Sequence, residues 1–265
     1  MCMSANLEAI RGKNAFICDM DGVLYHGNRL IDGIKEFVEW LKTQKKKFLF
    51  LTNSSERSRK DLKQKLSRMG IEVDESVFYT SALATASFLS QQRPGASAYV
   101  IGGSGLTNAL YDAGITMNDV DPEFVVVGET QSYSYDKIQQ AVSLVLNGAM
   151  LIGTNPDLTG KMETGIVPAC KALIAPIELA TGRQAYFIGK PNPLIMRHAL
   201  KQLECRREDT IIIGDRMDTD ILAGIESEID TVLVLTGVTS RDDLNRFSYR
   251  PVHILESAAE IRKKD

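Results

Sequence analysis

Short apolar runs alternate with amphipathic stretches from the beginning of the chain. Residues 15–18 (Ala-Phe-Ile-Cys) and 48–51 (Phe-Leu-Phe-Leu) each predict a buried strand. Between them a helix is predicted over 33–43, with Asp32 as its cap, because apolar residues recur there at helical spacing: Ile34, Phe37, Val38 and Leu41. Strand, helix and strand in this order indicate a parallel sheet that carries helices on its faces.

The alternation continues to the C-terminal part. Ser58 and Asp61 have nearly the spacing of a capping box and predict the start of a second helix. Helices are then expected over 83–89, 134–147 and 194–203, and strands over 99–101, 124–127, 150–152, 185–189, 210–214 and 231–235. The chain is therefore predicted to be an α/β protein throughout.

The organisation into domains follows from the absence of a linker. No Pro-, Gly- or Ser-rich segment separates the second group of strands and helices from the first. We therefore expect residues 83–184 to form a smaller α/β domain that is inserted into a parallel-sheet core made of residues 12–82 and 185–265.

Composition narrows the class of protein. Of the 265 residues, 44% are hydrophobic and 25% are charged, as in ordinary globular proteins, and the net charge of -3 gives no basic surface for a nucleic acid polymer. No long apolar run predicts a signal peptide or a membrane span. The cysteines Cys2, Cys18, Cys170 and Cys205 are scattered without a C-x-x-C pair, which favours the reduced cytoplasm and no zinc site.

The first strand ends in two carboxylates. Asp19 and Asp21 follow residues 15–18 directly, and Gly22 comes next. Aspartate is a poor strand former, so this ending suggests a site at the carboxyl edge of the sheet, where ligands of open α/β proteins bind. Two carboxylates this close repel each other unless a hard cation such as Mg²⁺ holds both. The alternative is a solvated Asp-Gly turn.

Polar residues follow other predicted strands as well: Thr52, Asn53, Lys190 and Asp215, with Asp220 a little over one helical turn further on. If these strands are parallel in one sheet, their ends share one edge. Carboxylates, a hydroxyl and an ammonium at that edge are the groups that phosphoryl transfer needs. Each residue also has an ordinary alternative as a turn residue, a surface lysine or a charge at a helix N-terminus.

These segments resemble the motifs of the haloacid dehalogenase (HAD) superfamily. The resemblance covers about residues 13–261 and lies in Asp19-Met-Asp-Gly-Val-Leu-Tyr25, Leu51-Thr-Asn53, Gly189-Lys-Pro191 and Gly214-Asp-Arg-Met-Asp-Thr-Asp220. Within the superfamily the chain is most similar to the NagD-type branch, which has a C2-type cap inserted between the second and third motifs. The resemblance implies a Rossmann-like core and a Mg²⁺-dependent phosphatase.

The resemblance also implies a role for each motif residue. Asp19 would be the nucleophile that forms an aspartyl-phosphate, and Asp21 would be the general acid and base. Asp19, the backbone carbonyl of Asp21, and Asp215 would hold Mg²⁺. Three further residues complete the set: Thr52 and Asn53 would bind phosphate oxygens, Lys190 would neutralise charge, and Asp220 would orient Lys190 or a metal-bound water.

The cap is expected to set substrate choice, and Asn155 and Asp157 are predicted to contact the leaving group. The substrate would be a small phosphorylated metabolite, such as a nucleoside monophosphate or a sugar phosphate. A homodimer through the cap is possible on the same resemblance. Two alternatives stay open: a receiver-like signalling domain that keeps its phosphoryl group, and a phosphotransferase or phosphomutase that passes it to a second substrate.

Overall fold

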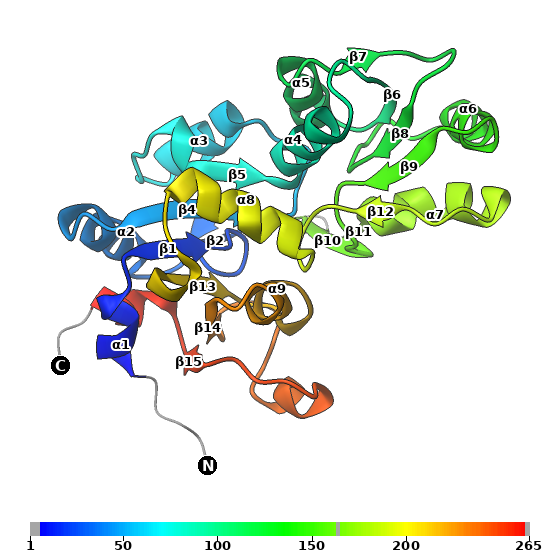
Figure 1. Ribbon diagram of the computed structural model, residues 1–265. Helices are drawn as coiled ribbons and strands as arrows, with labels where there is room; N and C mark the ends of the chain where they lie inside the picture. The colour runs from blue at the N-terminus through cyan, green and yellow to red at the C-terminus, as the bar shows by residue number, and fades with distance from the viewer. Residues whose placement is uncertain (1–5, 163–164, 263–265) are drawn as a thin grey trace. The chain divides into compact units, whose positions relative to one another are not determined.

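The computed structural model describes residues 6–162 and 165–262, which form two compact units (Figure 1). Unit 1 consists of Met1–Thr52, Lys63–Tyr79 and Lys190–Asp265, and unit 2 of Asn53–Leu62 and Thr80–Gly189. The predicted core and cap have nearby limits. They differ in three places, because residues 53–62, 80–82 and 185–189 lie in unit 2. Cys2 lies outside the described residues.

Unit 1 contains a six-stranded sheet with the strand order β15-β14-β13-β1-β4-β5. Its strands are β1 (Ala15–Cys18), β4 (Lys47–Thr52), β5 (Phe78–Thr80), β13 (Thr210–Gly214), β14 (Asp230–Val234) and β15 (His253–Leu255). β1 pairs in parallel with both β13 and β4, and all four of its residues are buried. The predicted parallel sheet is thus confirmed for β13, β1 and β4, the three strands that lead to Asp215, Asp19 and Thr52.

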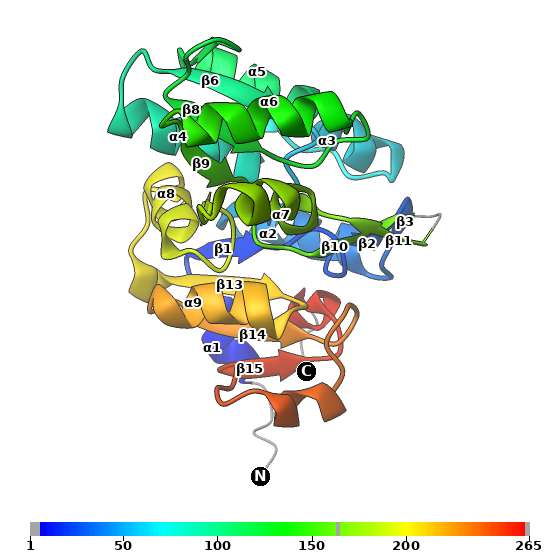
Figure 2. The ribbon, with the colours of Figure 1, turned by 90° about the vertical axis from the view of Figure 1, so that its right-hand side faces the viewer.

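Helices cover both faces of this sheet. They are α1 (Leu7–Gly12), α2 (Ile34–Thr43), α8 (Pro193–Leu203) and α9 (Leu222–Glu226), and Figure 2 shows α9 in front of β13 and β14. The apolar stripe of α2 is buried as predicted: Ile34, Phe37, Val38 and Leu41. The predicted cap Asp32 is wrong. Gly33 is the N-cap, with φ +80° and no capping side chain. A Cβ there would meet the Cβ of Ala259 at 2.8 Å, so this position favours glycine.

Short irregular elements complete unit 1. They are the hairpin of β2 (Tyr25–His26) and β3 (Arg29–Leu30), the 3₁₀ turns Glu75–Val77, Arg207–Asp209, Asp242–Arg246 and Ala258–Arg262, and a π turn at Met217–Ile221. Helix α3 (Arg59–Arg68) begins at the predicted capping pair, and its residues up to Leu62 belong to unit 2 while the rest belong to unit 1. The Asp61 carboxylate accepts a hydrogen bond from the Ser58 amide at 2.9 Å, and the Ser58 hydroxyl accepts one from the Asp61 amide at 3.2 Å.

Unit 2 is built on a five-stranded sheet with the order β12-β9-β8-β6-β7. Its strands are β6 (Ser97–Ile101), β7 (Thr116–Met117), β8 (Phe124–Val127), β9 (Met150–Gly153) and β12 (Tyr186–Phe187). Figure 1 shows α4 (Ser81–Gln92) and α5 (Ser104–Asp112) on one face of this sheet. The opposite face carries α6 (Tyr135–Leu146) and α7 (Cys170–Thr181) over a buried cluster that includes Val125, Val127, Leu151 and Ile174.

The predicted strand over 185–189 is shorter and lies in a different sheet. Only Tyr186 and Phe187 are extended as β12, and they pair in parallel with Ile152 and Gly153 of β9 in unit 2. The Phe187 ring packs directly over Gly153, where any Cβ would collide with it. Lys190 therefore does not follow a strand of the six-stranded sheet.

A second hairpin in unit 2 joins β10 (Thr159–Met162) to β11 (Gly165–Pro168). Among the described residues, no helix combines the length and the hydropathy that crossing a bilayer requires.

Candidate active site

Asp19 is held at the carboxyl end of β1, in the middle of the six-stranded sheet. Its amide donates a hydrogen bond to the carbonyl of Ile213 on β13 at 2.8 Å, which continues the strand pairing by one residue. The Asp19 side chain is 13% exposed. Cys18, the preceding residue, is fully buried, and burial raises the pKa of its thiol, as expected for an unreactive core residue.

The Lys190 ammonium lies between the carboxylates of Asp19 and Asp220. It is 2.6 Å from Asp19 Oδ1 and 2.6 Å from Asp220 Oδ1, and 3.4 Å from the carbonyl oxygen of Leu51. Burial alone would lower the pKa of Lys190. The two carboxylates outweigh burial, so the pKa of Lys190 is raised and the side chain stays charged.

Asp215 directly follows β13, and Asp220 lies in the π turn Met217–Ile221. One oxygen of Asp215 accepts a hydrogen bond from the Val238 amide at 2.7 Å, and Asp220 Oδ2 accepts one from the Arg216 amide at 3.2 Å. Burial and the neighbouring Asp220 raise the pKa of Asp215 to about 7. Burial also raises the pKa of Asp19, although Lys190 opposes this effect.

Three glycines make room for these acids. A Cβ on Gly22, which has φ +82°, would meet Asp215 Oδ2 at 2.5 Å, and a Cβ on Gly237 would overlap the same carboxylate. A Cβ on Gly214 would overlap Asp220. Gly214 and Gly237 were not among the predicted site residues. The available signal was a glycine at or just after the end of an apolar strand, where a backbone approaches a side chain closely.

Asp21 lies in the turn after β1, and Thr52 lies at the end of the neighbouring strand β4. Asp21 is exposed in the turn after β1, where the Gly22 amide donates a hydrogen bond to the carbonyl of Tyr25 at 2.8 Å. Thr52 is the last residue of β4 and is half-buried. The six-stranded sheet thus places Asp19, Thr52 and Asp215 at the carboxyl ends of three adjacent parallel strands.

The remaining predicted residues belong to unit 2. Asn53 donates its side-chain amide to Asp157 Oδ2 at 2.9 Å. Asn155 is completely buried and donates to the carbonyl oxygen of Asn53 at 2.7 Å and to Glu129 Oε1 at 2.5 Å. The contact of Asn155 and Asp157 with a leaving group stays a prediction.

The acids of unit 1 fit a hard divalent cation. Carboxylate oxygens of Asp19, Asp215 and Asp220 lie within 4.8 Å of one another, and the Lys190 ammonium pairs with Asp19 and Asp220. A set of carboxylate oxygen ligands suits Mg²⁺ better than a softer metal. The cluster shares Asp19 and Asp215 with the predicted ligand set and has Asp220 in place of the Asp21 carbonyl.

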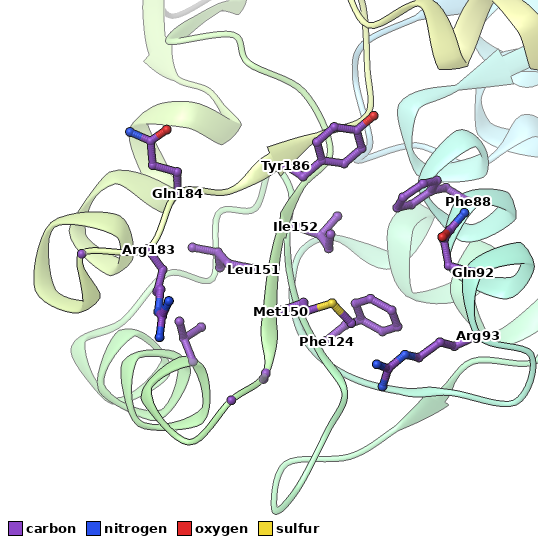
Figure 3. Close-up of a pocket in the computed structure, with 14 residues that line it drawn as sticks. Phe88, Gln92, Arg93, Phe124, Met150, Leu151, Ile152, Arg183, Gln184 and Tyr186 are labelled. Carbon is purple, nitrogen blue, oxygen red and sulfur yellow. The ribbon is translucent and has the colours of Figure 1, made fainter.

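Unit 2 also contains a cavity of about 890 Å³ beside β9 (Figure 3). Aromatic residues line it together with two arginines: Phe88, Phe124, Tyr186, Arg93 and Arg183. None of the predicted catalytic residues contributes to its wall.

A parallel sheet with an acidic cluster and a buried lysine at its carboxyl edge agrees with the haloacid dehalogenase class that the sequence motifs resemble. The profile described as haloacid dehalogenase-like hydrolase matches residues 16–116, and the profile described as HAD-hydrolase-like matches residues 187–261.

Individual relatives extend the match over nearly the whole chain. Ribonucleotide monophosphatase NagD of Escherichia coli is 46% identical over 245 residues, which cover 92% of this chain and 96% of NagD. Its structure superimposes with a TM-score of 0.89, over 94% of this chain and 98% of NagD. Dihydroxyacetone phosphatase of Corynebacterium glutamicum is 43% identical, covering 93% and 90% of the two chains. The structure of 4-nitrophenylphosphatase from Thermotoga maritima gives a TM-score of 0.91 at 31% identity, covering 96% and 97%.

The chain therefore belongs to the haloacid dehalogenase-like hydrolase family, in its NagD-type branch. It is a phosphoric monoester hydrolase. This membership confirms the resemblance seen in the sequence and decides against a receiver-like signalling domain.

Proposed function

We propose that this enzyme hydrolyses small phosphate monoesters through an aspartyl-phosphate on Asp19, with Mg²⁺ as cofactor. The observation that carries the proposal is the position of the Lys190 ammonium, 2.6 Å from both Asp19 and Asp220 and part of the same cluster as Asp215. An anionic nucleophile must approach an anionic phosphoryl group here. Fixed positive charge at the nucleophile reduces the repulsion between them.

Asp19 would attack phosphorus with its accessible carboxylate oxygen, and the bond from phosphorus to the ester oxygen would break. Asp21, exposed two residues further on, would give its proton to the departing alkoxide. The same carboxylate would then take a proton from the water that attacks phosphorus and releases Asp19 and inorganic phosphate. Formation and hydrolysis of the intermediate divide one difficult displacement into two easier steps.

Asp19 and Asp215, with the backbone carbonyl of Asp21, would hold Mg²⁺. When bound, the metal ion supplies charge neutralisation for the phosphoryl oxygens. Asp220 would keep Lys190 in place, because its other oxygen is fixed by the Arg216 amide.

Thr52 and the backbone amide of Asn53 would bind phosphoryl oxygens. Asp157 keeps its predicted contact with the leaving group, since it is only half-buried. The side chain of Asn155 is completely buried and donates a hydrogen bond to the carbonyl oxygen of Asn53.

The substrate class is supported by the names of the relatives: ribonucleotide monophosphatase, dihydroxyacetone phosphatase, acid sugar phosphatase and 4-nitrophenylphosphatase. We propose that this enzyme acts on a nucleoside monophosphate or a sugar phosphate. The test is phosphate release from a panel of these esters and 4-nitrophenyl phosphate, with Mg²⁺ or with EDTA. Turnover that requires Mg²⁺ supports the proposal, and full turnover in EDTA contradicts the role of the metal.

We also propose that two copies associate through unit 2 and that the enzyme is cytoplasmic. β12 pairs with only the last two residues of β9, so the edge of β9 at Met150 and Leu151 is left open beside the partly exposed Tyr186 (Figure 3). Light scattering of the wild type and Met150→Lys would test the dimer. A wild-type monomer contradicts it. The cytoplasmic location is supported by the free thiols Cys18, Cys170 and Cys205.

A further inference from the structure

Three side chains of unit 2 converge on one residue, Asn53. The Ser81 hydroxyl donates a hydrogen bond to the carbonyl oxygen of Asn53 at 2.5 Å, and Asn155 Nδ2 donates to the same oxygen at 2.7 Å. Asp157 Oδ2 accepts from the Asn53 side chain at 2.9 Å. Asn53 is therefore held at its carbonyl group and at its side chain together.

Ser81 and Asn155 are both fully buried. Asn155 is in turn held by the half-buried Glu129, which also contacts the fully buried Ser55. Glu129 Oε1 accepts from Asn155 Nδ2 at 2.5 Å, and its Oε2 accepts from the Ser55 amide at 3.0 Å and from the Ser55 hydroxyl. Breaking such a network leaves buried polar groups unsatisfied, so the conformation of the segment from Asn53 to Ser55 is strongly fixed.

Thr154 and Asn155, which follow β9, also contact a second segment of the chain, at Gly189. The carbonyl of Thr154 accepts a hydrogen bond from the Gly189 amide at 2.8 Å. A Cβ on Gly189 would meet Asn53 Oδ1 at 2.7 Å and Asn155 Cβ at 2.9 Å, so only glycine permits this approach. Thr154 and Asn155 thus contact both Asn53 and Gly189: Asn155 is hydrogen-bonded to Asn53, and Thr154 is hydrogen-bonded to Gly189.

Asn53 and Gly189 are the immediate neighbours in sequence of two proposed catalytic residues. Asn53 follows Thr52, and Gly189 precedes Lys190. Fixing the carbonyl and the side chain of Asn53 restricts its backbone torsions, which also restricts the amide that is proposed to bind a phosphoryl oxygen. A donor that is oriented before the reaction costs no reorganisation during it.

We propose that Asn155 is a positioning residue of the phosphatase reaction, which acts through the backbone of Asn53, supported by Glu129 and Ser81. The proposal rests on the proposed phosphate contact of the Asn53 amide. Asn155 itself touches neither substrate nor metal in this role. Its side-chain amide is required as a hydrogen-bond donor, and its shape alone is not sufficient.

Asn155→Ala and the isosteric Asn155→Asp test the proposal with 4-nitrophenyl phosphate and Mg²⁺. Misplacement of one phosphate donor should lower kcat/KM roughly 10- to 100-fold and raise the inhibition constant of inorganic phosphate. Asn155→Asp should be at least as damaging, because a carboxylate donates no hydrogen bond to the Asn53 carbonyl and is repelled by Glu129. Glu129→Gln should give a smaller change in the same direction.

Asn118→Ala is the matched control. Asn118 is an asparagine of unit 2 whose side chain also fixes a turn, through the amides of Val120 and Asp121, and it does not contact Asn53. It should leave kcat/KM and phosphate inhibition unchanged. If Asn155→Ala does not fold, Ser81→Ala, which removes one hydrogen bond to the Asn53 carbonyl, replaces it.

A purely structural role gives a different result from positioning. In that case Asn155→Asp lowers the melting temperature, but kcat/KM and the phosphate inhibition constant of the folded enzyme equal those of the wild type, and our inference is overturned. An inactive wild type would instead contradict the proposed function itself, so the two failures are distinguishable.

Discussion

Lys190 is a buried cation that forms ion pairs with two carboxylates of the site. Its side chain is 2% exposed and touches two carboxylates, one of which is only 1% exposed. Buried charges are costly to desolvate, and such a cluster persists only when each member is paired. Burial raises the pKa of both Asp19 and Asp215, and the neighbouring acids add to this effect while Lys190 opposes it. A divalent cation bound at the cluster would favour the ionised form of these carboxylates.

Lys190→Met should destabilise the protein and inactivate it. Removing one member of a buried ion cluster costs about 3–5 kcal/mol, since Asp19 and Asp220 then face each other without a cation. Loss of charge at the nucleophile should lower kcat about 100-fold or more. The measurements are thermal unfolding in EDTA and phosphate release with Mg²⁺.

Lys63→Met is the control for the lysine substitution. Lys63 forms an exposed pair with Glu75 at 4.0 Å, and loss of such a pair costs at most about 1 kcal/mol. Equal melting temperatures for the two variants would show that the Lys190 cluster adds no stability.

His198 gives an expectation for acid pH. Burial lowers the pKa of His198, whose ring is hydrogen-bonded to the Tyr79 hydroxyl at 3.2 Å. The unfolded chain therefore binds the proton first as the pH falls below about 6.5, so this histidine reduces folding stability toward acid pH. His198→Gln should make the fall in melting temperature between about pH 7 and 5 shallower, by less than about 4 °C. An unchanged or steeper fall would contradict this reading.

At the scale of elements, the site lies at the carboxyl ends of β1, β4 and β13, where glycines leave room for the acidic side chains. The apolar runs of β1, β4 and β13 were predictable because they are buried on both faces and end in polar residues. The sheet to which residues 185–189 belong was not predictable. Strand propensity does not identify a pairing partner, and the close fit of Phe187 on Gly153 that decides it exists only in three dimensions.

Gly237→Ala tests the packing of one strand end. The new Cβ would overlap the carboxylate of Asp215 and displace it. Disturbing a ligand in this way typically weakens metal affinity 10- to 100-fold, so a higher Mg²⁺ concentration should be needed for half-maximal activity.

Gly12→Ala is the matched control for this substitution, because no atom lies within 4 Å of a Cβ at that position. Its Mg²⁺ titration should equal that of the wild type. A wild-type titration for Gly237→Ala as well would contradict the ligand role of Asp215.

For the whole molecule, the sequence predicted a discontinuous α/β core with an insertion, and the structure divides into two α/β units near those limits. Asp19, Lys190 and Asp215 are far apart in the chain, yet the motif order placed them correctly in one cluster of unit 1. The network around Asn53 was not predicted, because its members have no periodic pattern and meet only after unit 2 has folded.

The central claim is that Asp19 is the nucleophile, and Asp19→Asn tests it most directly. Asparagine has nearly the same shape and keeps the amide contact to Ile213, so the fold should survive. We measure phosphate release from 4-nitrophenyl phosphate with Mg²⁺ for the variant and the wild type. Loss of the nucleophilic oxygen should lower kcat at least about a thousandfold and leave the circular dichroism unchanged. Turnover of a folded Asp19→Asn enzyme near the wild-type rate would contradict the claim.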